Sequence, residues 1–215
     1  MSRAPGSGKR LPSAPAQQNF EVAARIGFAA VRSQPAEQLL WLGARPSDDG
    51  WQLPVLASAL EVDLSASRVS GPGGHVARPA WAILTLHYLM LTARPVSREP
   101  EVTFADLATA RSYAGVYEAR VVRRLCATAG RDVLRLRAAA EALGSRAIPC
   151  SAGDAAFDFS VFPRVPVRLV WYAADDEFPP SATLLLPRNI ESFFSSEDIV
   201  VLSELLVSRL EGARF

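Results

Sequence analysis

The chain has 215 residues, of which 49% are hydrophobic and 21% are charged, and this composition is typical of a compact globular protein. Its 23 basic residues are 22 arginines and one lysine, Lys9. Schiff-base chemistry and a kinase-type strand lysine both need a lysine inside the folded body, so these classes are excluded. The segment Gly6–Arg10 also lacks the glycine spacing and the hydroxyl of a phosphate-binding P-loop.

Cysteine and histidine are sparse in this sequence. The cysteines are Cys126 and Cys150, the histidines are His75 and His87, and none stands at the spacing of a usual zinc or iron–sulfur motif. The sequence therefore leaves the cofactor unknown. Two cysteines without a secretory signal indicate reduced thiols, so we expect a cytoplasmic protein.

Residues 1–18 are rich in proline, serine and alanine and contain no acid, so we expect a disordered tail. A single α+β domain is expected over residues 19–215. It opens with a helix whose apolar side chains share one face: Val22, Ile26, Ala29 and Ala30. A second, short helix is expected after Pro35.

Alternating apolar residues between Trp51 and Ser70 predict a small antiparallel meander, which the glycine-rich loop Gly71–His75 closes. Residues 79–91 carry no charge and begin with proline, so they predict a central buried helix that is too short to span a bilayer. No membrane partner is expected. His87 lies on the apolar stripe of this helix, and we interpret it as a hydrogen-bonded core residue rather than a ligand.

Two further helices are expected between Tyr113 and Leu143, broken at Gly130, with Leu134 among the inward-facing side chains. Residues 111–146 hold eight arginines and three acids, whereas the rest of the chain after them holds five arginines and ten acids. Because the two blocks balance, pairing within the protein or association with another protein is favoured. Nucleic acid is an unlikely partner.

The last third of the chain is predicted to form strands followed by a helix. Strands are predicted over residues 157–161, 167–172 and 182–186. Ser195 followed three positions later by Asp198 is typical of a helix-capping box, and an amphipathic terminal helix follows it. The predicted fold class is α+β, with one small, mainly antiparallel sheet packed against several helices in a single domain.

Four features also carry a family resemblance: the run VFPRVPVRLVWYAADDEFPPSATLLLP, the pair Gly153-Asp154, the helix start Ser196-Glu197-Asp198 and the central LTLHYLM helix. Together they resemble the uncharacterised prokaryotic family called domain of unknown function 3786, over about residues 20–210. The resemblance implies a cytoplasmic α+β domain from bacteria or archaea with no established activity. Some relatives carry a cysteine-rich iron–sulfur segment linked to anaerobic corrinoid metabolism. This chain lacks that segment, which argues against a redox role.

The first candidate site is the acidic tip between the last two predicted strands. Asp175, Asp176 and Glu177, joined by Asp154, offer the clustered carboxylate oxygens that bind hard metal cations. The alternative is a solvated turn, because aspartate suits turn conformations and its charge reaches water.

Two further candidates would bind an anion. Arg164 stands between two prolines, where a fixed backbone presents its guanidinium to a carboxylate or phosphate, and its alternative is an internal salt bridge. In the glycine loop, Gly73 and Gly74 offer backbone N–H groups and His75 offers a proton donor. The alternative for this loop is a plain turn.

These candidates favour an uncharacterised cytoplasmic accessory or small-ligand-binding protein. Its small anionic or metal-containing ligand would lie between the glycine loop, Arg164 and the acidic hairpin. One alternative is a metal-assisted enzyme that uses the four carboxylates, with His75 or His87 moving a proton. Another alternative is a protein-interaction module that docks a protein partner. The sequence leaves open whether the protein is an enzyme.

Overall fold

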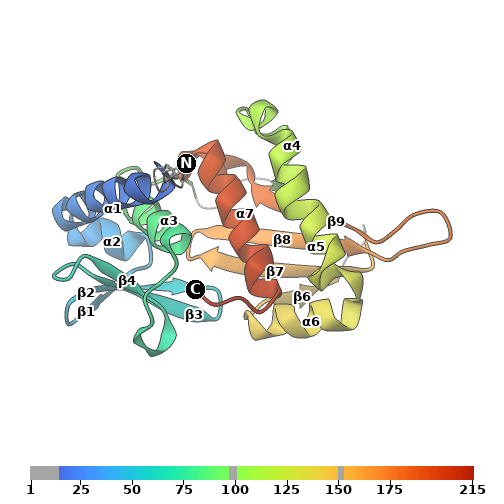
Figure 1. Cartoon of the computed structure of the whole chain (residues 1–215), viewed down its shortest axis with the longest axis horizontal. Helices are drawn as coiled ribbons and strands as arrows, with labels where there is room; N and C mark the ends of the chain where they lie inside the picture. The colour runs from blue at the N-terminus through green and yellow to red at the C-terminus, as the bar shows by residue number, and fades with distance from the viewer. Residues whose placement is uncertain (1–14, 97–100, 150–152) are drawn as a thin grey trace, which may run out of the picture.

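The computed structural model describes residues 15–96, 101–149 and 153–215 (Figure 1). Its principal helices are α1 (Pro15–Ser33), α2 (Ala36–Trp41), α3 (Pro79–Leu89), α4 (Ala114–Tyr117), α5 (Arg123–Ala127), α6 (Val133–Ala142) and α7 (Ser196–Leu210). The first four strands are β1 (Arg45–Ser47), β2 (Gly50–Val55), β3 (Ser58–Asp63) and β4 (Arg68–Ser70). The other strands are β5 (Glu101–Thr103), β6 (Arg146–Ile148), β7 (Ala155–Phe162), β8 (Val165–Tyr172) and β9 (Ser181–Pro187).

The expected α+β class with antiparallel pairing in a single domain is confirmed, but the strands form two sheets rather than one. The first sheet has the order β1-β2-β3-β4, and the second has the order β5-β9-β8-β7-β6. Strand β7 changes register at a bulge between Ser160 and Phe162, and the amide of Leu56 donates to the carbonyl of Ser160 there (3.1 Å). Because a bulge bends a strand, β7 meets the first sheet at this point without joining its ladder.

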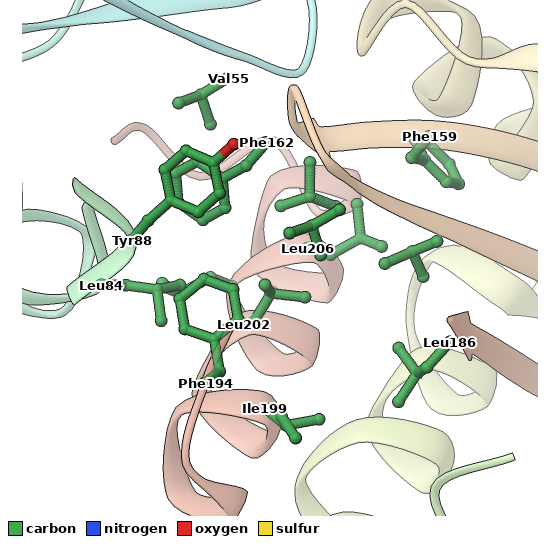
Figure 2. Packing of buried hydrophobic residues seen from close by; sticks show 14 of the residues in the cluster. Val55, Leu84, Tyr88, Phe159, Phe162, Leu186, Phe194, Ile199, Leu202 and Leu206 are labelled. Atoms are coloured by element: carbon green, nitrogen blue, oxygen red, sulfur yellow. The ribbon is translucent and has the colours of Figure 1, made fainter. Parts of the chain in front are cut away.

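The aromatic centre of the core joins both sheets to the helices (Figure 2). Tyr88 of α3 stacks on Phe162 of β7, with ring centroids 4.7 Å apart and planes 12° apart. The Tyr88 hydroxyl donates to the carbonyl of Leu42 (2.7 Å), so this buried polar group is satisfied. Phe194, just before α7, lies 6.2 Å from the Tyr88 ring and closes the cluster.

Helix α7 lies across one face of the five-stranded sheet, with α3 on one side and α5 on the other (Figure 1). The predicted capping box is confirmed: Ser195 Oγ accepts from the amide of Asp198 (3.2 Å), and Asp198 Oδ2 accepts from the amide of Ser195 (3.3 Å). Helix α3 is apolar on nearly every side and buried, as expected. No helix in the described part of the chain has both the length and the apolar content to cross a membrane.

Helix α1 departs from the expectation. It begins at Pro15, so it includes the last four residues of the predicted disordered tail, and the rest of that tail lies outside the described residues. Val22 and Ile26 are exposed (46% and 56%) instead of facing the core. The reason is that α1 approaches α3 through Gly27, where an added Cβ would lie 2.8 Å from the Cβ of Leu86.

The basic helical region also departs from the expectation. The chain does break near Gly130, but the first helix contains a π-helical turn at Glu118–Val122 that joins α4 to α5. Leu134 is 72% exposed rather than inward. The buried positions of α6 are Leu136 and Ala140, four residues apart, and this face turns Leu134 to solvent.

The substitution Phe162→Ala should lower the free energy of unfolding by about 3–5 kcal/mol, because it leaves a cavity beside Tyr88 between the two sheets. Urea unfolding followed by circular dichroism measures the loss. The matched control is Phe178→Ala, since Phe178 is 65% exposed on the β8–β9 hairpin, and it should change stability by no more than about 0.5 kcal/mol. Equal losses in both variants would contradict the central role of the Tyr88–Phe162 stack.

Candidate functional site

A groove of about 830 Å³ lies between α1, α3, α7 and the helical segment that ends with α5. Its volume is within the range of small-molecule sites in proteins. The apolar part of its lining comes from α1, α3 and α7. It consists of Phe20, Ala23, Ala80, Ile83, Leu84, Val201 and Leu205. The polar part includes His87, Ser195, Asp198 and three arginines.

The pair His87 and Asp198 lines this groove. His87 Nδ1 lies 2.9 Å from Asp198 Oδ1, and the two side chains are 35% and 17% exposed. Tyr88, the next residue, points into the core, so the rotation of about 100° per helical residue turns His87 toward α7. The hydrogen bond occupies Nδ1 and leaves Nε2 as the ring nitrogen available to the groove.

Asp198 stabilises the start of α7 and also orients the histidine. Its Oδ2 accepts from the hydroxyl of Ser195 (2.8 Å) while its Oδ1 faces His87. Burial acts to raise the pKa of Asp198, but the hydrogen bonds from His87 and Ser195 outweigh burial and lower that pKa. Because Ser195 bonds to Asp198 and not to His87 in the described contacts, the arrangement is not a serine-hydrolase triad.

The protonation of His87 is shifted by its partner. The hydrogen bond to Asp198 raises the pKa of His87, and partial burial opposes this only in part. His87 therefore keeps its proton to a higher pH than a free histidine does. Near neutral pH, Nε2 can donate a hydrogen bond to an anion when the ring is charged, or accept a proton when the ring is neutral.

The opposite wall of the groove is held together by ion pairs between α7 and the basic helical region. Arg120 pairs with Glu204. Arg124 donates from Nε to Glu211 (2.9 Å) and from Nη2 to Ser208 (3.0 Å), and the bond to Glu211 is the main reason that its pKa is raised. The pairing within the protein that the charge balance favoured is therefore present at these two arginines.

Arg164, the first predicted anion ligand, is engaged by the protein itself. Its Nε donates to the carbonyl of Trp41 (2.5 Å), and its guanidinium lies over the Trp41 ring at 4.0 Å. It pairs with neither the acidic hairpin nor the glycine loop, and it lines a separate surface depression with Glu101 and Asp158. These contacts hold the β7–β8 turn against α2.

Two of the four predicted metal ligands, Asp154 and Asp175, accept hydrogen bonds from backbone amides. Asp175 Oδ1 accepts from the amides two and three residues further on (2.9 and 2.7 Å), and these bonds lower its pKa. Asp154 Oδ2 accepts from the amide of Ala173 (2.7 Å). Across the described ranges, no three histidine, cysteine, aspartate or glutamate side chains form a group that could hold a metal ion. A metal bound by Asp154, Asp175, Asp176 and Glu177 stays a prediction.

The glycine loop lies at a different place from both Arg164 and the acidic hairpin. His75 lines a pocket with Arg209, Arg214 and Phe215 from the C-terminal segment. The β8–β9 hairpin that carries the acidic tip projects from the body of the protein (Figure 1). The three predicted parts of one cleft therefore line separate regions of the surface.

Sequence reasoning did not find the pairing of His87 with Asp198. Each residue carried a local signal, since His87 is the one histidine on an apolar helix and Asp198 occupies the third position of a capping box. The two residues are 111 positions apart, so no spacing rule connects them. Only the packing of α3 against α7 brings them together.

Comparison with known proteins gives a family and no activity. A family model described as "Domain of unknown function (DUF3786)" matches residues 34–209. This range includes His87, Asp198 and the wall of the groove formed by α5 and α7. No curated protein and no solved structure matches the chain.

The substitution Asp198→Asn should lower the pKa of His87, because it removes the carboxylate that favours the imidazolium. NMR titration of the His87 ring, assigned with His87→Gln, measures this shift. The stabilisation from a raised histidine pKa is fully present below about pH 6.5, the ordinary histidine pKa, and is lost as pH rises through the raised pKa.

The difference in unfolding free energy between the wild type and His87→Gln should therefore shrink as the solution goes from mildly acidic to alkaline. His87→Gln is the proper variant for this comparison, since it leaves the Ser195–Asp198 capping box in place. An unchanged His87 pKa in Asp198→Asn would contradict the account.

Proposed function

The chain belongs to the family described as Domain of unknown function (DUF3786), and we propose that it is a cytoplasmic small-ligand-binding protein. Its ligand is an organic anion with an apolar body, and it occupies the groove between α1, α3, α5 and α7. One observation carries this proposal: the His87–Asp198 pair fixes a histidine with a free Nε2 at an otherwise apolar wall. A polar group placed in this way orients a ligand, and the apolar surface around it supplies affinity.

The apolar side of the groove supports a ligand with a hydrocarbon or aromatic body. Phe20 is 41% exposed and lines the groove together with Leu84 and Leu205, which are buried. Covering such surface contributes roughly 25 cal/mol per Å² removed from water. A ligand of this kind would shield Phe20 from solvent.

The polar end of the groove supports a single negative charge on the ligand. Arg120 and Arg124 are already paired with acids of α7, so His87 and Arg78 are the cationic groups left to meet an acid. Arg78 forms no ion pair with any described residue. Glu197 also lines the groove and opposes a second negative charge, which favours a monoanion.

The state of the described cysteine supports the cytoplasmic location. Cys126 is a free thiol that packs against the core, and burial raises its pKa, which disfavours the reactive thiolate. A reduced thiol of this kind fits a reducing compartment.

The groove can be blocked with a matched pair of variants on one helix. Ala23→Trp places a large side chain in the groove, whereas Ala29→Trp places it on the exposed side of α1, outside the groove lining. Binding of octanoate, an anion with an apolar chain, is measured by isothermal titration. We expect Ala23→Trp to weaken binding at least about tenfold, Ala29→Trp to bind as the wild type does, and His87→Gln to lose about tenfold at neutral pH.

Native mass spectrometry with elemental analysis, on protein purified without chelators, reports what the chain retains. A small organic acid that is retained by Ala29→Trp and lost from Ala23→Trp supports the proposal. Equal retention by both variants, or equal octanoate affinity, would contradict it. A stoichiometric divalent metal that is lost on Asp175→Asn would instead favour the metal-assisted alternative.

A further inference from the structure

A second concave site lies where the loop Gly71–His75 meets the segment that follows α7. It encloses about 350 Å³ and is lined by Gly71, Pro72, His75, Arg209, Arg214 and Phe215. Its ionisable side chains are two arginines and a histidine, and no acidic side chain lines it. It shares no lining residue with the groove that contains His87 and Asp198.

Arg209 is held in place on two sides. Its guanidinium carbon lies 4.2 Å from the centre of the Phe215 ring, and its Nη1 donates to the carbonyl of Ala213. Phe215 in turn packs edge-on against the buried Trp81, with ring centroids 5.0 Å apart. A guanidinium fixed in this way loses little further freedom when it binds an oxyanion.

The charge of Arg209 is not paired with any acidic side chain in the described part of the chain. Its Nε is buried and has no hydrogen-bond acceptor there, and neither Arg209 nor Arg214 forms an ion pair with a described acidic side chain. Burial and the nearby charge of Arg78 lower the pKa of Arg209, yet an arginine keeps its proton at any ordinary pH. An uncompensated, partly buried cation is unfavourable, and a bound anion would relieve it.

The glycine loop shapes the pocket through close approach rather than through its amides. An added Cβ at Gly71 would lie 3.2 Å from the Cβ of Phe215, so the loop and the C-terminal segment fit because this residue is glycine. Gly73 has φ 74° and lies beside the ring of His75. The amides of Gly71 and Gly74 are already bonded within the loop (2.8 and 3.1 Å). Side chains, not these two amides, are therefore left to bind an anion.

We propose that this pocket binds a tetrahedral oxyanion of the phosphate type, held by Arg209, Arg214 and His75. A planar guanidinium donates two parallel hydrogen bonds to such an oxyanion, and a histidine adds a third donor. Two arginines carry more positive charge than one carboxylate balances, which favours phosphate. The anion is either inorganic phosphate or the phosphate group of a small ester.

Inorganic phosphate is the first probe, titrated at constant ionic strength while the amide signals of the Gly71–His75 loop are followed by NMR. We expect saturable shifts, and we expect Arg214→Gln to weaken binding at least about tenfold. Arg209→Gln should also weaken binding. Arg214→Gln is the cleaner variant, because Arg214 is exposed and its substitution leaves the packing of Phe215 intact. The matched control is Arg135→Gln, an exposed arginine on α6, which should bind as the wild type does.

Phenyl phosphate is the second probe and separates the two sources of the anion. Tighter binding than inorganic phosphate identifies an ester, and equal binding identifies free phosphate. A chain that ends at Phe215 places a carboxylate on a residue that lines the pocket, so both titrations are repeated with two glycines added after Phe215. Chemical-shift changes that stay linear in phosphate concentration in both chains would overturn the proposal. An equal loss of phosphate affinity in Arg135→Gln and Arg214→Gln would also overturn it.

Discussion

The stacking of Tyr88 on Phe162 fixes α3 between the two sheets (Figure 2). The hydrogen bond from the Tyr88 hydroxyl to the carbonyl of Leu42 fixes the rotation of that helix. The neighbouring residue, His87, is thereby turned out of the core and toward α7. A core contact that excludes water thus determines where the one histidine of α3 points. The groove depends on this constraint, since α3 supplies both His87 of the polar pair and part of the apolar lining.

Helix α7 contributes side chains to both candidate sites. At its start, a capping carboxylate that the helix needs for its own stability also binds His87. Near its end, Arg209 lies over Phe215 without a carboxylate partner among the described side chains. Glu204 within the helix and Glu211 just after its last residue bind arginines of the basic helical region. The basic and acidic blocks of the sequence therefore meet at this helix. Some of the neighbouring arginines form ion pairs with its acids, and one pocket beside it is lined by cationic side chains and by no acidic ones in the described part of the chain.

Local signals predicted the local structure well. The strands predicted over residues 157–161 and 167–172 and the Ser195–Asp198 capping box depend on neighbours a few positions apart, and all are confirmed. The division into two sheets could not be read in this way, because it depends on a bulge in β7 that has no fixed sequence signature. The predicted cleft is not assembled as expected: the glycine loop does border a pocket, but the arginines that line this pocket are Arg209 and Arg214, and Arg164 lines a different one. Such long-range partners are chosen by packing, which no spacing rule encodes.

The most direct test of the ligand-binding account is a crystal structure of the protein purified from its native cells without dialysis or chelators. The account predicts non-protein density in the groove between α1, α3, α5 and α7, with an acidic group within hydrogen-bonding distance of His87 Nε2 and an apolar body against Phe20 and Leu84. A groove that holds only water, or one that is closed by the side chains of α1, would contradict it.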